Sequence, residues 1–133
     1  MALQFSTTVR AARADAIETA VGTAPTLELR TGAPPAAPAT ADSGTVVATM
    51  TLPSDWLTNP GTGVKALSGT WQDASADAGG TVGHFRIKQG ATCHIQGTVT
   101  ISGGGGDMTL DNNVVTLGQQ VTITSFTLTE GAA

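Results

Sequence analysis

Residues 82–101, VGHFRIKQGATCHIQGTVTI, carry the pattern that decides the fold of this chain. Apolar and polar residues alternate on both sides of a central glycine, with Phe85 before it and Ile95 after it. Such alternation is typical of strands that bury one face, and two alternating runs around a glycine predict a β-hairpin. The hairpin predicted here joins a strand at 82–88 to a strand at 93–101.

The register of this hairpin follows from matching the apolar faces of its two strands. Phe85 then lies opposite Ile95, and the turn is a three-residue loop, Gln89-Gly90-Ala91. The same register places Arg86 across from His94. We expect this second face of the hairpin to be polar and exposed to solvent.

The two-residue period recurs along most of the remaining chain, in which threonine, a residue that favours strands, is the most abundant. The other segments that show the period are 26–30, 45–52, 67–71, 108–110, 115–117 and 121–128. In the last of them the apolar positions change from odd to even numbers near Ser125, which predicts a β-bulge. Together these patterns predict a mainly β protein, an antiparallel β-sandwich or jelly-roll-like domain of roughly seven to nine short strands with one N-terminal α-helix.

The N-terminal helix is predicted from an N-cap at Ser6 or Thr7 to a stop at Gly22. Its apolar positions recur at steps of three and four residues, and they are Phe5, Val9, Ala12, Ala16, Ile17 and Ala20. A face made mostly of alanine buries little area, so we expect this helix to pack closely on the sheet or on another subunit. The chain is then a single domain, 1–133, with a helical segment at 1–22 and the β-sandwich at 26–130.

Two segments without a period stand out between the predicted strands. The first, TGAPPAAPATADSG at 31–44, contains Pro34, Pro35 and Pro38, which cannot donate hydrogen bonds to a sheet, and it is predicted to be a surface strap. The second contains four consecutive glycines at 103–106. A phosphate-binding glycine loop needs a helix after it, whereas Asp107 and another strand segment follow here, so the run is interpreted as a loop between two strands.

The charge and composition of the chain exclude several functional classes. Six basic residues against ten acidic ones give a net charge of -4, and no stretch gathers the basic residues into a patch, which disfavours nucleic-acid binding. The N-terminus lacks the unbroken apolar core of a signal peptide, and no long apolar run suited to a membrane follows. A single cysteine, Cys93, excludes an internal disulfide and fits assembly inside the cell.

The sequence also lacks a recognisable catalytic or metal-binding motif. No serine lies in a nucleophile elbow, and the acidic residues fall mostly in loops, where Asp73, Asp77, Asp107 and Asp111 are interpreted as turn caps. We interpret the two histidines, at 84 and 94, as surface residues, because two ligands are too few for a zinc site. The chain is therefore predicted not to be an enzyme, with no metal and no cofactor.

The chain resembles a group of small proteins encoded among the virion genes of tailed bacteriophages and prophages. The resemblance runs through the stretches MALQFSTTVRAARADAIETAVG, TLELRTGAPP, GTWQDASADAGGTVGHFRIK and GGGGDMTLDNNVVTLGQQVTITSFTLT. It implies a structural part of a virus particle that is assembled in the cytoplasm of the host bacterium. The family offers no catalytic residues to carry over to this chain.

The leading functional hypothesis is a capsid decoration or cement protein, because a sandwich with few charges offers neutral surface for protein contacts. Its candidate interface residues are Phe5, Val9, Ala12 and Ala16 of the helix and Pro34, Pro35 and Pro38 of the strap. We expect these residues to contact the major capsid protein or neighbouring copies in a homo-oligomer. A tail, collar or fibre-attachment component that contacts tail proteins is the alternative within this class.

A different class of function is a glycan-binding module that recognises host surface sugars. Such sites stack sugars on exposed aromatic rings, and Trp56, between Pro53 and Pro60, is the candidate ligand-binding residue. The other interpretation of Trp56 is a buried plug. Trp71 lies in phase with Leu67 and is predicted to belong to the core.

Overall fold

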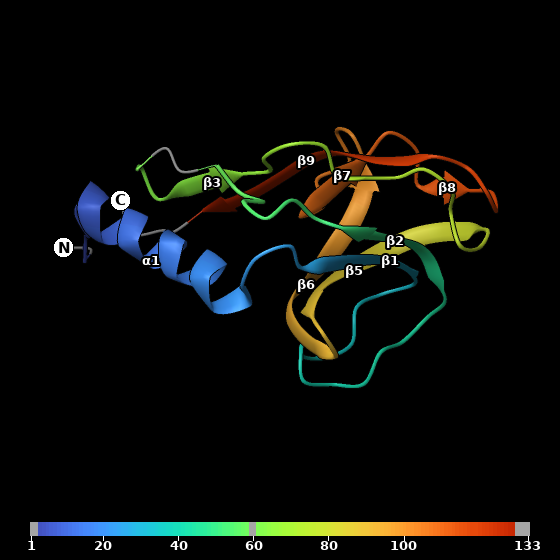
Figure 1. Ribbon diagram of the computed structural model, residues 1–133, viewed down its shortest axis with the longest axis horizontal. Coiled ribbons are helices and arrows are strands. Elements are labelled where there is room, and N and C mark those ends of the chain that lie inside the picture. The colour runs from blue at the N-terminus through green and yellow to red at the C-terminus, as the bar shows by residue number, and fades with distance from the viewer. Residues whose placement is uncertain (1–2, 59–60, 130–133) are drawn as a thin grey trace.

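A computed structural model describes residues 3–58 and 61–129, and it shows a mainly β, sandwich-like fold with one N-terminal helix, as predicted (Figure 1). Glu130, the last residue of the predicted sandwich, and Pro60 lie outside the described residues. The helix is α1 (Thr7–Val21). The strands are β1 (Thr26–Thr31), β2 (Val46–Thr51), β3 (Val64–Ala66), β4 (Gln72–Asp73), β5 (Gly80–Gln89), β6 (Thr92–Ile101), β7 (Met108–Leu110), β8 (Val114–Val115) and β9 (Val121–Thr129).

The strands form one curled sheet with the order β2-β1-β5-β6-β7-β9-β3, while β4 pairs with β9 and β8 pairs with β5. All of these pairs are antiparallel except β6 with β7, which is parallel. The parallel pair corrects the prediction of a purely antiparallel arrangement. It arises because the glycine loop after β6 carries the chain back to the level of Val99 before β7 begins.

The core lies inside the curl of the sheet and contains four aromatic rings in contact. Trp71 lies at its centre, with ring centroids 6.1 Å from Trp56 and 5.6 Å from Phe126, and the Phe85 ring lies 5.7 Å from Phe126. Leu27 and other inward residues of β1, β2 and β5 pack around these rings, together with inward residues of β6, β7, β8 and β9. The prediction that Trp71 is a core residue is confirmed.

The β5–β6 hairpin exists as predicted, but its register differs by two residues. Phe85 lies opposite Gly97 and Arg86 opposite Gln96, instead of opposite Ile95 and His94. The chain turns in two residues instead of three, at 90–91, and a bulge next to Ile95 leaves His94 without a partner in the ladder. Because the partner of Phe85 changes by an even number of residues, the same faces of the two strands still meet, and Phe85 faces the core.

The four glycines join β6 to β7, as the sequence predicts, and each has a specific geometric role. Gly103 and Gly105 adopt φ angles of +86° and +82°, which favour glycine. At Gly104 a Cβ atom would lie 2.7 Å from the Thr100 Cβ, and at Gly106 one would lie 2.9 Å from the Thr100 nitrogen. Larger side chains would therefore prevent so short a connection between two neighbouring parallel strands.

Three further strand predictions can be compared with the structure. A register shift in β9 leaves Thr124 unpaired between Ser125 and Ile123, which confirms the predicted bulge. The segment 67–71 is not a strand, because β3 ends before it and Gly69 turns the chain at a φ of +76°. The prediction of a strand at 115–117 is also wrong, because β8 ends at Val115 and Leu117 is 68% exposed.

Candidate functional site

The helix α1 is attached to the sheet through a polar contact with β3. Lys65 of β3 is buried, and its Nζ lies 2.9 Å from the Asp15 carboxylate and 3.1 Å from the Glu18 carboxylate. Burial alone would lower the pKa of Lys65, but these two hydrogen bonds raise it above its usual value. Nearby, a Cβ atom on Gly63 would lie 2.7 Å from the Arg10 Cβ, so the loop before β3 approaches the helix backbone closely.

Burial and the ion pair with Lys65 shift the pKa of Glu18 in opposite directions. Burial raises the pKa of the Glu18 carboxyl above the usual value, and the hydrogen bond with Lys65 opposes that rise. A pocket of about 500 Å³ lies at this junction, lined by both residues and by Asp15. The helix is thus held by these ion pairs together with the buried Ala14 and Val21.

Most of the predicted apolar stripe of α1 points away from the sheet, whereas Phe5 and Ile17 of that stripe are half-buried. Val9, Ala12, Ala16 and Ala20 are exposed, while the buried side chains of the helix are Ala14 and Val21. At 100° per residue, the exposed group lies on nearly the opposite side of the helix from the buried pair. The sequence predicts that this stripe packs on the sheet or on another subunit. The four exposed residues do not pack on the sheet, so another subunit or a partner protein is the alternative that stands for them.

The start and end of α1 agree with the prediction. The Ser6 hydroxyl accepts a hydrogen bond from the Val9 nitrogen at 3.2 Å, and Gly22 ends the helix at a φ of +96°. Phe5, just before the helix, is half-buried, with the Arg13 guanidinium 5.0 Å from the centre of its ring. Figure 1 shows α1 at one end of the molecule beside β3.

The proline-rich segment between β1 and β2 forms a strap over the outer face of the sheet. We define the strap as residues 32–45, whose ends are closed by a 3.1 Å hydrogen bond from the Thr31 nitrogen to the Thr45 oxygen. The carbonyl of Pro35 accepts from Gln96 Nε2 at 2.7 Å, and that of Pro38 accepts from Arg86 Nη2 at 2.6 Å. The prediction of a surface strap is confirmed.

The strap is therefore both an internal cover and an exposed surface. Its proline carbonyls face the chain's own sheet, where Gln96 and Arg86 hold them. Pro34 and Pro35 are half-buried and Pro38 is exposed, so part of each remains open to a partner.

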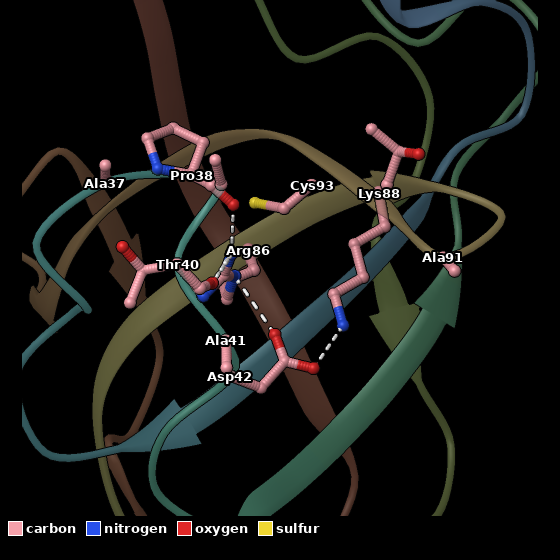
Figure 2. A pocket seen from close by; sticks show the side chains of 11 residues that line it. Ala37, Pro38, Thr40, Ala41, Asp42, Arg86, Lys88, Ala91 and Cys93 are labelled. Atoms are coloured by element: carbon pink, nitrogen blue, oxygen red, sulfur yellow. Dashed lines mark hydrogen bonds and ion pairs between the residues drawn. The ribbon is translucent and has the colours of Figure 1, made fainter.

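Beneath the strap lies a cluster of three cations around one carboxylate, and two of the cations, Arg86 and Lys88, are drawn with Asp42 in Figure 2. The Asp42 carboxylate of the strap lies 3.1 Å from Arg30 Nη2, 3.2 Å from Arg86 Nε and 2.6 Å from Lys88 Nζ. Glu28 of β1 adds a second carboxylate, 2.9 Å from Arg30 Nη2 and 3.0 Å from Lys88 Nζ. Two strands and the strap are thus tied together by charge.

These contacts shift the protonation of the cluster. The hydrogen bond with Lys88 lowers the pKa of Asp42 below its usual value, and the positive charges of Arg30 and Arg86 act in the same direction. Burial would lower the pKa of Lys88, but its hydrogen bonds with Asp42 and Glu28 raise it. Both shifts favour the charged forms of Asp42 and Lys88 at neutral pH.

A pocket of about 590 Å³ opens between the strap and the end of the β5–β6 hairpin. Residues 37–42 of the strap form one wall, residues 91–93 form the other, and Arg86 and Lys88 form the floor. Figure 2 shows Arg86, Asp42 and Lys88 close together. Cys93 belongs to the wall formed by residues 91–93.

One histidine is buried next to this cluster, contrary to the prediction that both lie on the surface. His84 is fully buried, and its Nδ1 lies 2.9 Å from the Gly32 oxygen of the strap, so that Nδ1 must carry the proton and donate it. His94, in the bulge, is exposed as predicted. The difference arises because the strap covers the face of β5 that the alternation marks as polar.

Trp56 takes the position of the buried plug. Its side chain is 0% exposed, and its Nε1 donates a hydrogen bond to the Gly22 oxygen at 3.0 Å. Neither face of the ring is open to a sugar, because the core covers it. The hypothesis of a glycan site at this residue therefore has no structural basis.

Two of the four loop carboxylates predicted to be turn caps accept local hydrogen bonds: Asp73 accepts from the Ser75 nitrogen at 3.0 Å and Asp111 from the Asn112 nitrogen at 2.9 Å. The other two bind neighbouring strands instead. Asp107 accepts from the Thr98 nitrogen of β6 at 2.9 Å, and Asp77 accepts from the Thr49 hydroxyl of β2 at 2.8 Å. Within residues 3–58 and 61–129, no group of three or more potential ligand side chains could share a metal ion. In the same residues, no helix has the length and apolar character needed to cross a membrane.

The comparisons with known proteins add no relative: no family model, curated protein or solved structure matches the chain.

Proposed function

We propose that this chain is a non-enzymatic structural protein of a tailed-phage virion that decorates the head shell, with the outer face of α1 as its contact surface. The observation that carries the proposal is the apolar stripe of α1, which the chain's own sheet leaves exposed. Val9 is 42% exposed, and Ala12 and Ala16 lie beside it on the same side of the helix. Small side chains let a neighbouring backbone approach closely, which suits a helix that packs on a protein shell.

The distribution of charge supports protein contacts over other ligands. Only 12% of the residues are charged, and three of the six basic residues, Arg30, Arg86 and Lys88, are buried beneath the strap. The exposed surface thus carries few charges, most of them acidic, and a low density of charge lowers the cost of removing a surface from water at an interface. The outer side of the strap, including Pro38, offers a second neutral surface for the shell or for a neighbouring copy.

A paired substitution tests the contact surface directly. Ala12→Glu with Ala16→Lys places a favourable ion pair four residues apart, so the helix keeps its stability while its outer face becomes charged. The matched control carries the same two side chains at exposed positions on the other end of the molecule, as Thr116→Glu with Gln120→Lys. We expect the helix variant to fold and to be lost from purified particles, and the control to be incorporated at the natural level.

Copy number distinguishes the head from the tail. Quantitative mass spectrometry of purified particles gives the ratio of this chain to the major capsid protein. A decoration protein is present in hundreds of copies, whereas a tail, collar or fibre-attachment component is present in a handful or a few dozen. A low ratio would move the proposal to the tail, and complete absence from particles would contradict it.

A further inference from the structure

The pocket beside the strap has a positively charged floor in a chain whose net charge is -4. Arg30, Arg86 and Lys88 contribute three positive charges to the cluster, and Glu28 and Asp42 contribute two negative ones. Three minus two leaves one positive charge in excess. A cluster of this sign, partly enclosed by the strap, favours an anionic group.

Arg86 is the most deeply placed of these cations, with 1% of its surface exposed. Its Nη2 donates to the Pro38 and Thr40 oxygens at 2.6 and 3.0 Å, and its Nε faces Asp42. Its Nε and Nη1 are both buried and make no hydrogen bond among the described residues, although Nε lies within ion-pair distance of Asp42. A guanidinium binds a carboxylate with two parallel N–H groups, so Arg86 retains capacity for a further oxygen.

Asp42 is the member of the cluster that can leave most easily. Its side chain is 36% exposed, compared with 2% for Arg86 and 11% for Lys88. No residue of the strap, 32–45, is fully buried, so the strap is held by polar contacts and not by the apolar core. Moving Asp42 outward therefore exposes the cations without opening the core.

We propose that this pocket is a binding site for a carboxylate, which Asp42 occupies from within and which an incoming carboxylate takes over. The cations already surround carboxylate oxygens at 2.6 to 3.2 Å. The walls carry the short side chains of Ala37, Pro38 and Ala91, which suit a ligand with a short aliphatic body. The ligand is either a small free carboxylate or the acidic side chain of a partner protein.

The site is separate from the outer face of α1, so this proposal does not depend on the proposed function. A nuclear magnetic resonance titration tests it with sodium acetate, with the peptide acetyl-Ala-Glu-Ala-amide and with its Gln counterpart. Sodium chloride at equal ionic strength is the reference. The signals to follow are the backbone amides of residues 37–42 and 91–93 and the Nε–H of Arg86.

The variant Asp42→Asn removes the negative charge of the internal occupant and should bind the carboxylate at least about tenfold more tightly than the natural chain, because a neutral amide competes weakly for the three cations. Asp77→Asn changes the net charge equally at the Thr49 contact, away from the cluster, and should bind as the natural chain does. Added acetate or Glu peptide should also raise the melting temperature of Asp42→Asn more than that of Asp77→Asn.

The two probes separate the sources of the ligand. Saturation by acetate means that a small free carboxylate is sufficient, and saturation by the Glu peptide alone assigns the site to a partner's acidic side chain; either result supports the proposal. Shifts equal to those in sodium chloride would overturn it. Equal affinities of the Asp42→Asn and Asp77→Asn variants would overturn it as well.

Discussion

Gly97 permits the contact on which the hairpin register depends. A Cβ atom at this position would lie 2.8 Å from Phe85 Cε1 and 2.7 Å from Asp107 Oδ2. We expect Gly97→Ala to destabilise the fold by about 1–3 kcal/mol, because the Phe85 ring and the Asp107 carboxylate would both have to move. Urea unfolding measures the change in free energy of unfolding.

Gly79→Ala is the matched control for this substitution. A Cβ atom at Gly79 would lie 3.5 Å from its nearest neighbour, the Val115 oxygen, which is an ordinary contact. The control should unfold at nearly the natural urea concentration. Equal losses in both variants would show that the cost comes from the alanine itself and not from the Phe85 contact.

Asp42 gives the stability of the fold a defined dependence on pH. Its pKa is lowered in the folded state, chiefly by Lys88, so its contribution is present above its ordinary pKa of about 4 and is lost as the pH falls through the lower folded value. At pH 7 the natural chain should therefore be more stable than Asp42→Asn. The difference should shrink progressively below pH 4, whereas Asp77→Asn should show no comparable difference at either pH.

The buried cluster shows what a single residue pattern can and cannot predict. Alternation in β5 correctly places Phe85 inward, and it assigns His84, Arg86 and Lys88 to the other face. It gives no sign that this second face is buried, because the covering strap comes from residues more than forty positions away. The one available signal was Asp42, the only charged residue in a neutral, proline-rich segment.

At the scale of elements, α1 is held to β3 by Lys65 and its two carboxylates. Glu18 is the more buried of the two, with 16% of its side chain exposed against 61% for Asp15. We expect Glu18→Ala to weaken the attachment of α1 by about 1–2 kcal/mol, because Lys65 loses its shielded charged hydrogen bond. Hydrogen exchange should accelerate in the α1 amides and not in β5 or β6.

Asp15→Ala is the control for this element. Its carboxylate is mostly exposed, and an ion pair in water contributes little to stability. The exchange of α1 should change less than in Glu18→Ala. A larger effect of Asp15→Ala would place the attachment on the exposed side of the helix and contradict the role given to Glu18.

The glycine loop between β6 and β7 separates two kinds of glycine requirement. Gly103→Ala adds a Cβ atom with nothing within 4 Å but at a φ of +86°, so it should cost only the strain of about 1–2 kcal/mol. Gly104→Ala drives its Cβ into Thr100, a residue fixed in a paired strand, and should cost more. Thermal unfolding of both variants checks this order, and the reverse order would contradict the account of the loop.

The limits of the helix and the β9 bulge were predictable, whereas the short strands β3, β4 and β8, the faces and the registers were less so. The helix limits and the β9 bulge follow from capping residues and a parity change, both of which are local. The inner face of α1 could not be found from hydrophobicity, because it uses Arg10 and Glu18, while the alanine stripe faces outward. The parallel β6–β7 pair was missed because so short a connection rarely joins neighbouring parallel strands.

For the whole molecule, the structure gives three surfaces a physical basis. The outer face of α1 is apolar and exposed, the strap carries an exposed outer side, and the pocket beside the strap has a cationic floor. The proposed attachment to a shell uses the first two, and the proposed carboxylate site uses the third. Residues 37–42 of the strap also form a wall of the pocket, so only a variant in α1 should leave the carboxylate site unchanged.

The central claim is that the outer face of α1 joins this chain to the head shell. A cryo-electron microscopy map of the intact particle tests it most directly. The account predicts density for the sandwich on the head, with α1 between it and the shell and with Val9, Ala12 and Ala16 at the contact. Density in which α1 faces solvent, or in which the chain lies only on the tail, would contradict it.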